Sequence, residues 1–265
     1  MSEKKGFMEI VPLINFDSDA GSVKFDEKLC LRRIEPSELS NLIDKLTRDV
    51  TPYLSLLKAD YVLENKIVPL STKHWNDVIL ALKLLKLGDL QVLAAFHLNE
   101  ENRISLSIHD DLHRSTLALN PYFLKKEETT ELTKLWERVQ GMTSKPYLSF
   151  PLRVFAEAYK KGASYDDRIV DYMVAFESLI FHGMDKTIEP AGKVMGIAVS
   201  MLLGIDQENR TKIKMTLKNA YEVRNAKVHG NVAKLKKLKA KSNVRLLSMN
   251  VEDYLRHALR RFIEE

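Results

Sequence analysis

One segment of this 265-residue chain restricts the possible folds more than any other. The pattern over 166–181 predicts a helix, and after Asp171 that helix is apolar over most of its surface. A helix that is hydrophobic on nearly all sides has to be covered on nearly all sides. We therefore expect it to be the central, buried helix of a bundle.

The rest of the second half also predicts helices. Pro190 suits the first turn of a helix that runs to Leu203, and Asp206 or Asn209 can cap the next helix, which ends at Gly230. Further helices are expected at 152–160 and 252–265. A lysine-rich run at 234–241 separates the last two helices, and one reading of it is a mobile, solvated loop.

The first half predicts a mixture of strands and helices. A helix begins near Pro36, with Ser37 or Ser40 as a possible cap, and 141–146 is expected to be a linker. The other expected elements are strands at 7–15, 29–34, 90–98 and 103–109 and helices at 74–87 and 127–140. The predicted fold class is mainly α, with a mixed α+β region at 1–145 before a helical bundle at 146–265.

Composition and simple motifs exclude several classes of protein. The single cysteine, Cys30, rules out an internal disulfide framework and favours a reducing compartment. The longest apolar stretch, 195–205, is far shorter than the ~20 residues of a membrane span, so we expect a cytoplasmic protein. The chain has no phosphate-binding glycine loop and no Gly-x-Ser-x-Gly elbow, so NTPase and hydrolase-triad functions are not predicted, and no cofactor is expected.

Basic charge is concentrated in the second half. From Pro151 to the end there are 21 Lys and Arg residues against 14 Asp and Glu, whereas the residues before Pro151 have 20 and 22. This distribution favours an anionic partner for the second half. A lysine-rich solvated surface would give the same distribution.

The residues that point to chemistry lie at 221–230. Arg224, Asn225 and His229 fall within six residues at the end of a predicted helix, and Gly230 stops that helix. Arginine binds phosphate and histidine titrates near neutral pH, a pairing that suits phosphodiester chemistry without a metal. At ~100° per residue, Arg224 and His229 are ~140° apart around the axis. Either the arginine wraps round, the helix loosens before Gly230, or two copies of the helix bring their motifs together.

Glu177 is the only acidic or basic residue, histidine aside, at 172–184. A carboxylate on so apolar a helix needs a cation partner, and Arg224 is the candidate. Such a pair could be purely structural and still be compatible with catalysis. Tyr221 shares a polar helical face with Asn225 and His229, and this face either meets a partner helix or lines a cleft.

These residues resemble the HEPN superfamily, and specifically its Apea-like domains. The likeness rests on Arg224-Asn225-x-x-x-His229-Gly230 and on the helix from Asp166 that contains Phe176-Glu177-Ser178-Leu179. It covers roughly 151–265. It implies a homodimeric, metal-independent endoribonuclease with a role in defence or as a toxin. In that reaction His229 would be the general acid or base, Arg224 would hold the phosphate, and Asn225 would orient the phosphate or the histidine. Glu177 and Tyr221 would support them, and the RNA backbone would follow Lys227, Lys234, Lys236, Lys237, Lys239, Lys241 and Arg245.

Two alternatives stay open beside this function. Several HEPN domains have lost catalysis and bind nucleotide or RNA, or act as dimeric scaffolds. His109 and His113 have the spacing of a zinc-protease motif, but His109 ends a strand-like run rather than lying on a helix, so no metal site is predicted.

Overall fold

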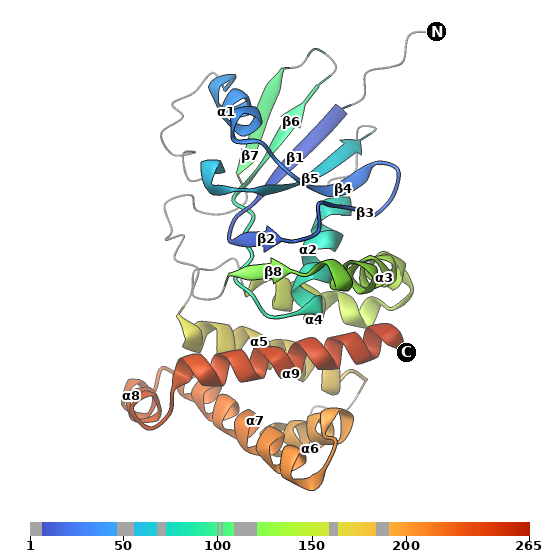
Figure 1. Cartoon of the computed structure of the whole chain (residues 1–265). Coiled ribbons are helices and arrows are strands. Elements are labelled where there is room, and N and C mark those ends of the chain that lie inside the picture. Colours follow the sequence, from blue (N-terminus) through green and yellow to red (C-terminus); the bar gives the residue numbers. More distant parts are fainter. Residues whose placement is uncertain are drawn as a thin grey trace. The chain divides into compact units, whose positions relative to one another are not determined.

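The computed structural model describes residues 7–46, 56–67, 73–99, 101, 103–108, 121–158, 164–183 and 191–265. The chain forms two compact units (Figure 1). The first comprises Met1–Lys83 and Gly88–Glu137, and the second comprises Leu84–Leu87 and Arg138–Glu265. The second unit is therefore discontinuous in sequence, because a four-residue segment from the first half belongs to it.

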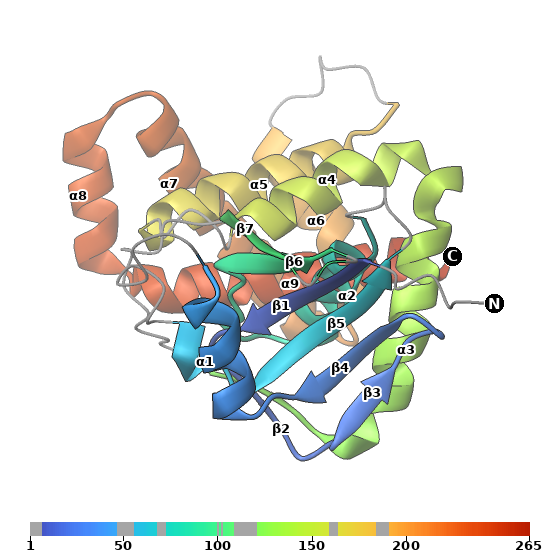
Figure 2. The same cartoon turned by 90° about the horizontal axis from the view of Figure 1, so that it is seen from above.

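The first unit is built on a six-stranded sheet with the order β3-β4-β5-β1-β6-β7, which Figure 2 shows from above. All neighbouring strands in it are antiparallel. A separate pair, β2 (Phe16–Ser18) and β8 (Tyr122–Leu124), is parallel. The strands of the large sheet are β1 (Phe7–Leu13), β3 (Ser22–Lys24), β4 (Leu29–Arg33), β5 (Tyr61–Ile67), β6 (Ala94–Leu98) and β7 (Ile104–Ile108).

Both faces of the central strands are covered, because β1 is buried over its last five residues. On one face, α1 (Pro36–Asp44) contributes Leu39, Leu42 and Ile43 to a core that includes Ile10 and Phe96. Side chains alternate across a strand, so Glu9 points to the opposite face. Trp75 of α2 (Lys73–Leu85) lies close to Glu9 on that face.

The strands and helices expected in the first half are present, with different limits for some. The strand expected at 90–98 begins at Ala94, and β2, β3, β5 and β8 were not predicted. Neither serine caps α1, because Glu35 is its N-cap and Pro36 opens it. The expected linker at 141–146 is instead a 3-10 helix, Gly141–Ser144, which follows α3 (Thr129–Gln140) and precedes a helix that starts at Pro146.

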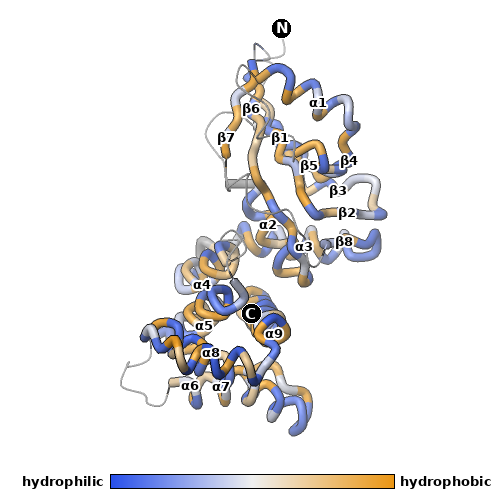
Figure 3. Tube along the Cα trace, turned by 90° about the vertical axis from the view of Figure 1, so that its left-hand side faces the viewer, coloured by the Kyte–Doolittle hydropathy of each residue, from blue (hydrophilic) through white to orange (hydrophobic). Residues whose placement is uncertain are grey.

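The second unit is a helical bundle around α5 (Tyr165–Ile180), which contacts α4, α6, α7 and α9. This confirms the expected central helix, and its buried face carries Ile169, Tyr172, Met173 and Phe176. Hydrophobic and hydrophilic positions alternate along the helices (Figure 3). The other helices are α4 (Pro146–Glu157), α6 (Ala191–Leu203), α7 (Gln207–Val228), α8 (Val232–Lys241) and α9 (Val244–Glu264).

Three predictions in this half are wrong. Helix α9 starts at Val244, eight residues before the expected 252. Helix α4 starts at Pro146, six residues before the expected 152, and holds Pro151 in its interior. The lysine-rich run is the helix α8, which Asn231 caps by accepting from the Lys234 N–H. The chain is thus mainly α with a mixed α+β region first, as predicted. Among the described residues, no helix is long and apolar enough to cross a membrane.

Candidate functional site

The helix that carries the motif has well-defined ends. Of the two possible caps, Asp206 and Asn209, it is Asp206 that caps α7, with its side chain accepting a hydrogen bond from the Asn209 N–H at 2.7 Å. At the other end Gly230 has φ +65°, and the N–H groups of Gly230 and Asn231 donate to the carbonyls of Lys227 and Ala226. This Schellman pattern requires a left-handed residue, which is why glycine ends the helix. His229 is therefore fixed at the helix terminus.

Arg224 is held by three neighbours. Its Nη2 lies 3.1 Å from Oε2 of Glu177 on α5, which confirms the predicted ion pair. Its Nη1 donates to Oδ1 of Asn225 at 3.1 Å. The guanidinium carbon also lies 5.8 Å from the centre of the Tyr221 ring, within cation–π range. Both side chains of the ion pair are mostly buried, with 21% of Arg224 and 25% of Glu177 exposed. The arginine is consequently restricted in orientation.

Tyr221 is fixed by close packing between α6 and α7. A Cβ at Gly192 would lie 2.6 Å from the Tyr221 ring, so only glycine leaves room for this contact. Tyr221 thus joins the two helices and also supports the guanidinium of Arg224. The sequence suggested a supporting role for Tyr221, and its physical basis is this packing.

His229 is exposed at the end of α7. Within the described residues its imidazole has no hydrogen-bond or ion-pair partner. Helix α7 remains regular to Val228, so the ~140° separation of Arg224 and His229 is retained in one chain. The structure brings Arg224, Asn225, Glu177 and Tyr221 together and leaves His229 apart from them.

Two of the lysines expected to bind RNA are engaged in ion pairs instead. The Lys227 ammonium lies 2.8 Å from both Asp166 Oδ2 and Asp167 Oδ1, and Lys239 Nζ lies 2.9 Å from Asp166 Oδ2. Burial alone would raise the pKa of Asp166, but hydrogen bonds from Lys227, Ser164 and Lys239 lower it well below its usual range. These contacts tie α5, α7 and α8 together. We refer to Asp166, Asp167, Lys227 and Lys239 as the acidic latch.

The other basic residues of this region lie on the surface. Lys234, Lys237 and Lys241 are exposed and share one face of α8, because they are spaced by three and four residues. Lys236 and Arg245 are exposed as well. The helix therefore presents a row of cations next to the end of α7.

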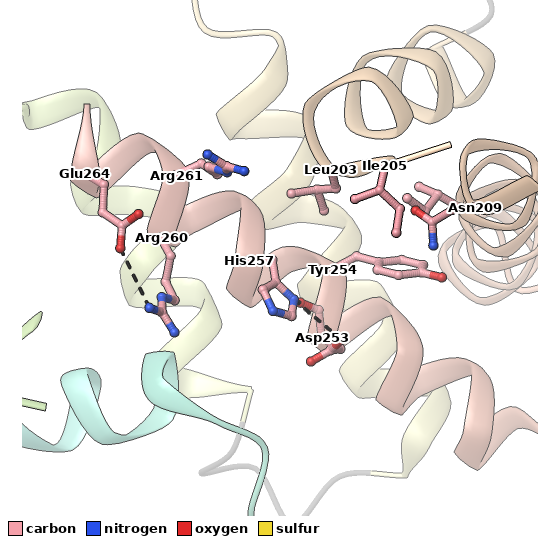
Figure 4. A pocket seen from close by; sticks show the side chains of 10 residues that line it. Leu203, Ile205, Asn209, Asp253, Tyr254, His257, Arg260, Arg261 and Glu264 are labelled. Atoms are coloured by element: carbon pink, nitrogen blue, oxygen red, sulfur yellow. Dashed lines mark hydrogen bonds and ion pairs between the residues drawn. The ribbon is translucent and has the colours of Figure 1, made fainter. Parts of the chain in front are cut away.

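A pocket of about 490 Å³ lies in the second unit, and none of the motif residues lines it (Figure 4 shows the lining side chains). Burial would raise the pKa of Asp253 in this pocket, but hydrogen bonds from His257 and Arg256 lower it to about 2. This pocket was not predicted from the sequence, because it depends on how α9 packs against the start of α7. The lining residues are Leu203, Ile205, Asn209, Ile213, Asp253, Tyr254, His257, Arg260, Arg261 and Glu264.

No metal site is found in the described part of the chain, where no three His, Cys, Asp or Glu side chains are grouped to hold an ion. His109 and His113 lie outside the described residues. Cys30 is a free, half-buried thiol whose pKa is raised, mainly by burial. No protein-family model, curated protein or solved structure matches this chain.

Proposed function

We propose that this protein is a metal-independent endoribonuclease of the HEPN type. In this reaction the RNA 2′-hydroxyl attacks the adjacent phosphate, leaving a 2′,3′-cyclic phosphate and a 5′-hydroxyl. The observation that carries the proposal is an arginine held by a carboxylate, an amide and an aromatic ring, five residues before an exposed histidine. A role in defence or as a toxin belongs to the same proposal.

The arginine retains donors for a phosphate. A guanidinium has five N–H groups, two on each Nη atom. Glu177 and Asn225 each accept from a different Nη atom, which leaves one N–H on each for phosphate oxygens. Two such bonds would bind the phosphate in a bidentate manner and stabilise the charge that develops on it in the transition state.

The histidine requires a second copy of the chain. Arg224 is engaged with Glu177 and α7 is regular to Val228, so neither a wrapped arginine nor a loosened helix explains how the two residues would meet. We therefore propose a homodimer in which His229 of one chain and Arg224 of the other serve one phosphate, with His229 as general acid or base. Asn225, which holds Nη1, would orient the arginine.

RNA would follow the exposed lysine row of α8. Lys234, Lys237 and Lys241 form this row, and Lys236 and Arg245 extend it. Each phosphate contact contributes to a salt-dependent affinity. Lys227 and Lys239 are left out of this surface, because the acidic latch neutralises them.

The direct test is cleavage of a labelled mixed RNA pool in EDTA by the wild type, Arg224→Ala and His229→Ala. We expect fragments with cyclic-phosphate ends from the wild type and a rate at least ~100-fold lower in each variant. Arg261→Ala and His182→Ala are matched controls, because they remove the same side-chain types elsewhere in the second unit. Mixing the two inactive variants should restore part of the activity, since some heterodimers would carry one intact composite site.

A wild-type protein that does not cleave RNA, or motif variants that cleave it equally fast, would contradict the nuclease proposal. Two observations then favour the second candidate, a non-catalytic HEPN module that binds RNA or nucleotide as a dimer. Arg224 is already neutralised by Glu177, and no partner of the His229 side chain occurs in the described residues. RNA binding that weakens on mutation of Lys234, Lys237 and Lys241, without cleavage, would support this candidate.

A further inference from the structure

The first unit holds a second group of reactive side chains, unrelated to the Arg224 motif. His97 on β6 places its Nε2 2.8 Å from the Ser107 Oγ on β7. Its Nδ1 lies 3.5 Å from Oε1 of Glu9 on β1. Serine, histidine and carboxylate thus follow one another across three adjacent strands. The two ring nitrogens of His97 therefore face two different partners. This is the arrangement that a catalytic base needs between a nucleophile, here Ser107, and a group that orients the base, here Glu9.

The strand register explains the alignment. Glu9 is directly opposite His97 in the β1–β6 pair, and Ser107 is one diagonal step from His97 in the β6–β7 pair. Paired positions and positions two apart lie on the same face of a sheet. All three side chains therefore share the face opposite α1. No loop is needed to form the group, which is why no sequence motif signals it.

The carboxylate of the row is buried, whereas the histidine and the serine are partly exposed. Glu9 is only 1% exposed, the His97 side chain is 29% exposed, and Ser107 is half-buried on β7 at the edge of the described sheet. A ligand can thus approach the serine and histidine, whereas the carboxylate is shielded from water. Ser107 and His97 are thus partly accessible to solvent, whereas the Glu9 carboxylate behind them is buried.

Glu9 is a buried carboxylate next to the His97 ring. Within the described residues, neither of its oxygens has a hydrogen bond of good geometry. Burial raises its pKa, and the nearby His97, Trp75 and Asn65 oppose that rise. A buried carboxylate is stabilised when an adjacent group becomes positive. An imidazolium formed at His97 would provide that charge.

We propose that Ser107 is an activated nucleophile that accepts acyl groups from carboxylic esters, with His97 as its general base and Glu9 as a positioning residue. The Ser107 oxygen attacks the carbonyl carbon and its proton passes to Nε2 of His97. The ester C–O bond then breaks, and the alcohol leaves with the proton from His97. A water molecule then gives a proton to the same ring and attacks the acyl carbon. The bond from that carbon to the Ser107 oxygen breaks, the ring returns the proton to this oxygen, and the carboxylic acid leaves.

A fluorophosphonate probe tests the nucleophile directly, because it reacts with activated serines and not with ordinary ones. The folded full-length chain is incubated with the probe, and intact mass and peptide mapping locate the adduct. We expect one probe per chain, on Ser107, and none after unfolding in urea. Ser107→Ala should abolish labelling, and His97→Gln should slow it by about 100-fold.

Ser105→Ala is the matched control, because Ser105 is on the same strand and the same face and directly opposite His97. It should label like the wild type, as should Arg224→Ala and His229→Ala, so this test is independent of the nuclease proposal. The absence of an adduct on Ser107 in the folded wild type would overturn the proposal. So would labelling that survives unfolding or is equally fast in His97→Gln.

The role of Glu9 is tested by a conservative pair of variants. Glu9→Gln should slow labelling of Ser107 by roughly tenfold, and Glu9→Asp should recover part of the loss because it keeps the charge. A merely structural role would change the melting temperature without this order in the labelling rates. Equal labelling rates in the wild type and Glu9→Gln would remove Glu9 from the mechanism.

Discussion

At the scale of single residues, Arg224 and Glu177 are the clearest link between sequence and structure. An acidic side chain on an otherwise apolar helix predicted a cationic partner, and the ion pair at 3.1 Å confirms it. Pairing of this kind is needed because a mostly buried charge is costly without its counterion. The pair therefore stabilises the α5–α7 contact whether or not Arg224 is catalytic.

The energetic coupling of this pair is measurable by a double-mutant cycle. Glu177→Gln and Arg224→Gln should each destabilise the fold, and the double variant should cost less than their sum by about 1 kcal/mol. Urea unfolding of the four proteins gives the coupling energy. Glu177→Gln with Arg261→Gln is the control cycle, since no ion pair of Arg261 is found in the described residues, and it should be additive.

Asp253 should contribute to stability in a pH-dependent way. Its pKa is about 2 in the folded chain, below the ordinary value of 3.8, so its contribution is complete above about pH 4 and is lost as the pH falls towards 2. We expect Asp253→Asn to be less stable than the wild type by about 1–2 kcal/mol at pH 7, after allowance for solvent screening of this partly exposed group. Unfolding curves that keep the same gap at pH 2.5 would contradict this assignment.

At the scale of elements, the lysine-rich run at 234–241 forms an ordered helix, α8, where a loop was one expectation, and the acidic latch holds this helix to α5. Helix α8 has five lysines in ten residues, yet Asn231 caps it and Lys239 anchors it to Asp166 on α5. Asp166 is 2% exposed and reaches two ammonium groups at once. The neighbouring Asp167 is more exposed and pairs only with Lys227 among the described residues.

Removal of the latch should free α8 before the rest of the bundle. Asp166→Asn leaves Lys227 and Lys239 without their shared carboxylate, so we expect backbone amides of α8 to exchange hydrogen at least tenfold faster. Because the Asp166 pKa is lowered, acid should have the same effect on the wild type well below pH 4. Asp167→Asn is the control and should change α8 exchange much less.

At the scale of the whole molecule, the second unit is discontinuous in sequence. Arg256 on α9 is 7% exposed, and its Nη1 donates to the Leu85 carbonyl at 2.9 Å and to that of Leu84 at 3.4 Å. Both carbonyls belong to the segment that joins the second unit from the first half. A fragment that begins at Arg138 would lack these acceptors.

The contribution of these two carbonyls can be measured by substituting Arg256 both in the full chain and in that fragment. In the full chain Arg256→Met should destabilise the second unit by about 1–3 kcal/mol, because it removes charged hydrogen bonds. In the fragment 138–265 the same substitution should cost less, since the pair with Asp253 can be lost there but the Leu84 and Leu85 carbonyls are absent. Hydrogen exchange of α9 measures the effect in the full chain, and urea unfolding measures it in the fragment. An equal loss of stability in the two would disprove the role of the Leu84 and Leu85 carbonyls.

The sequence by itself indicated the helical bundle, the central position of α5, a cap for α7 at Asp206 or Asn209, the glycine stop of α7 and the Glu177–Arg224 pair. The helices, the cap and the glycine stop depend on local periodicity and backbone preference. The ion pair was expected because a charge on an apolar helix is costly without a partner. Strand pairing, the acidic latch, the pocket on α9 and the Ser107–His97–Glu9 row were decided only by the tertiary structure. They depend on pairing between strands, on packing between helix faces, or on contacts between residues far apart in the sequence, such as Glu9 with His97 and Asp166 with Lys239. No local pattern encodes such contacts.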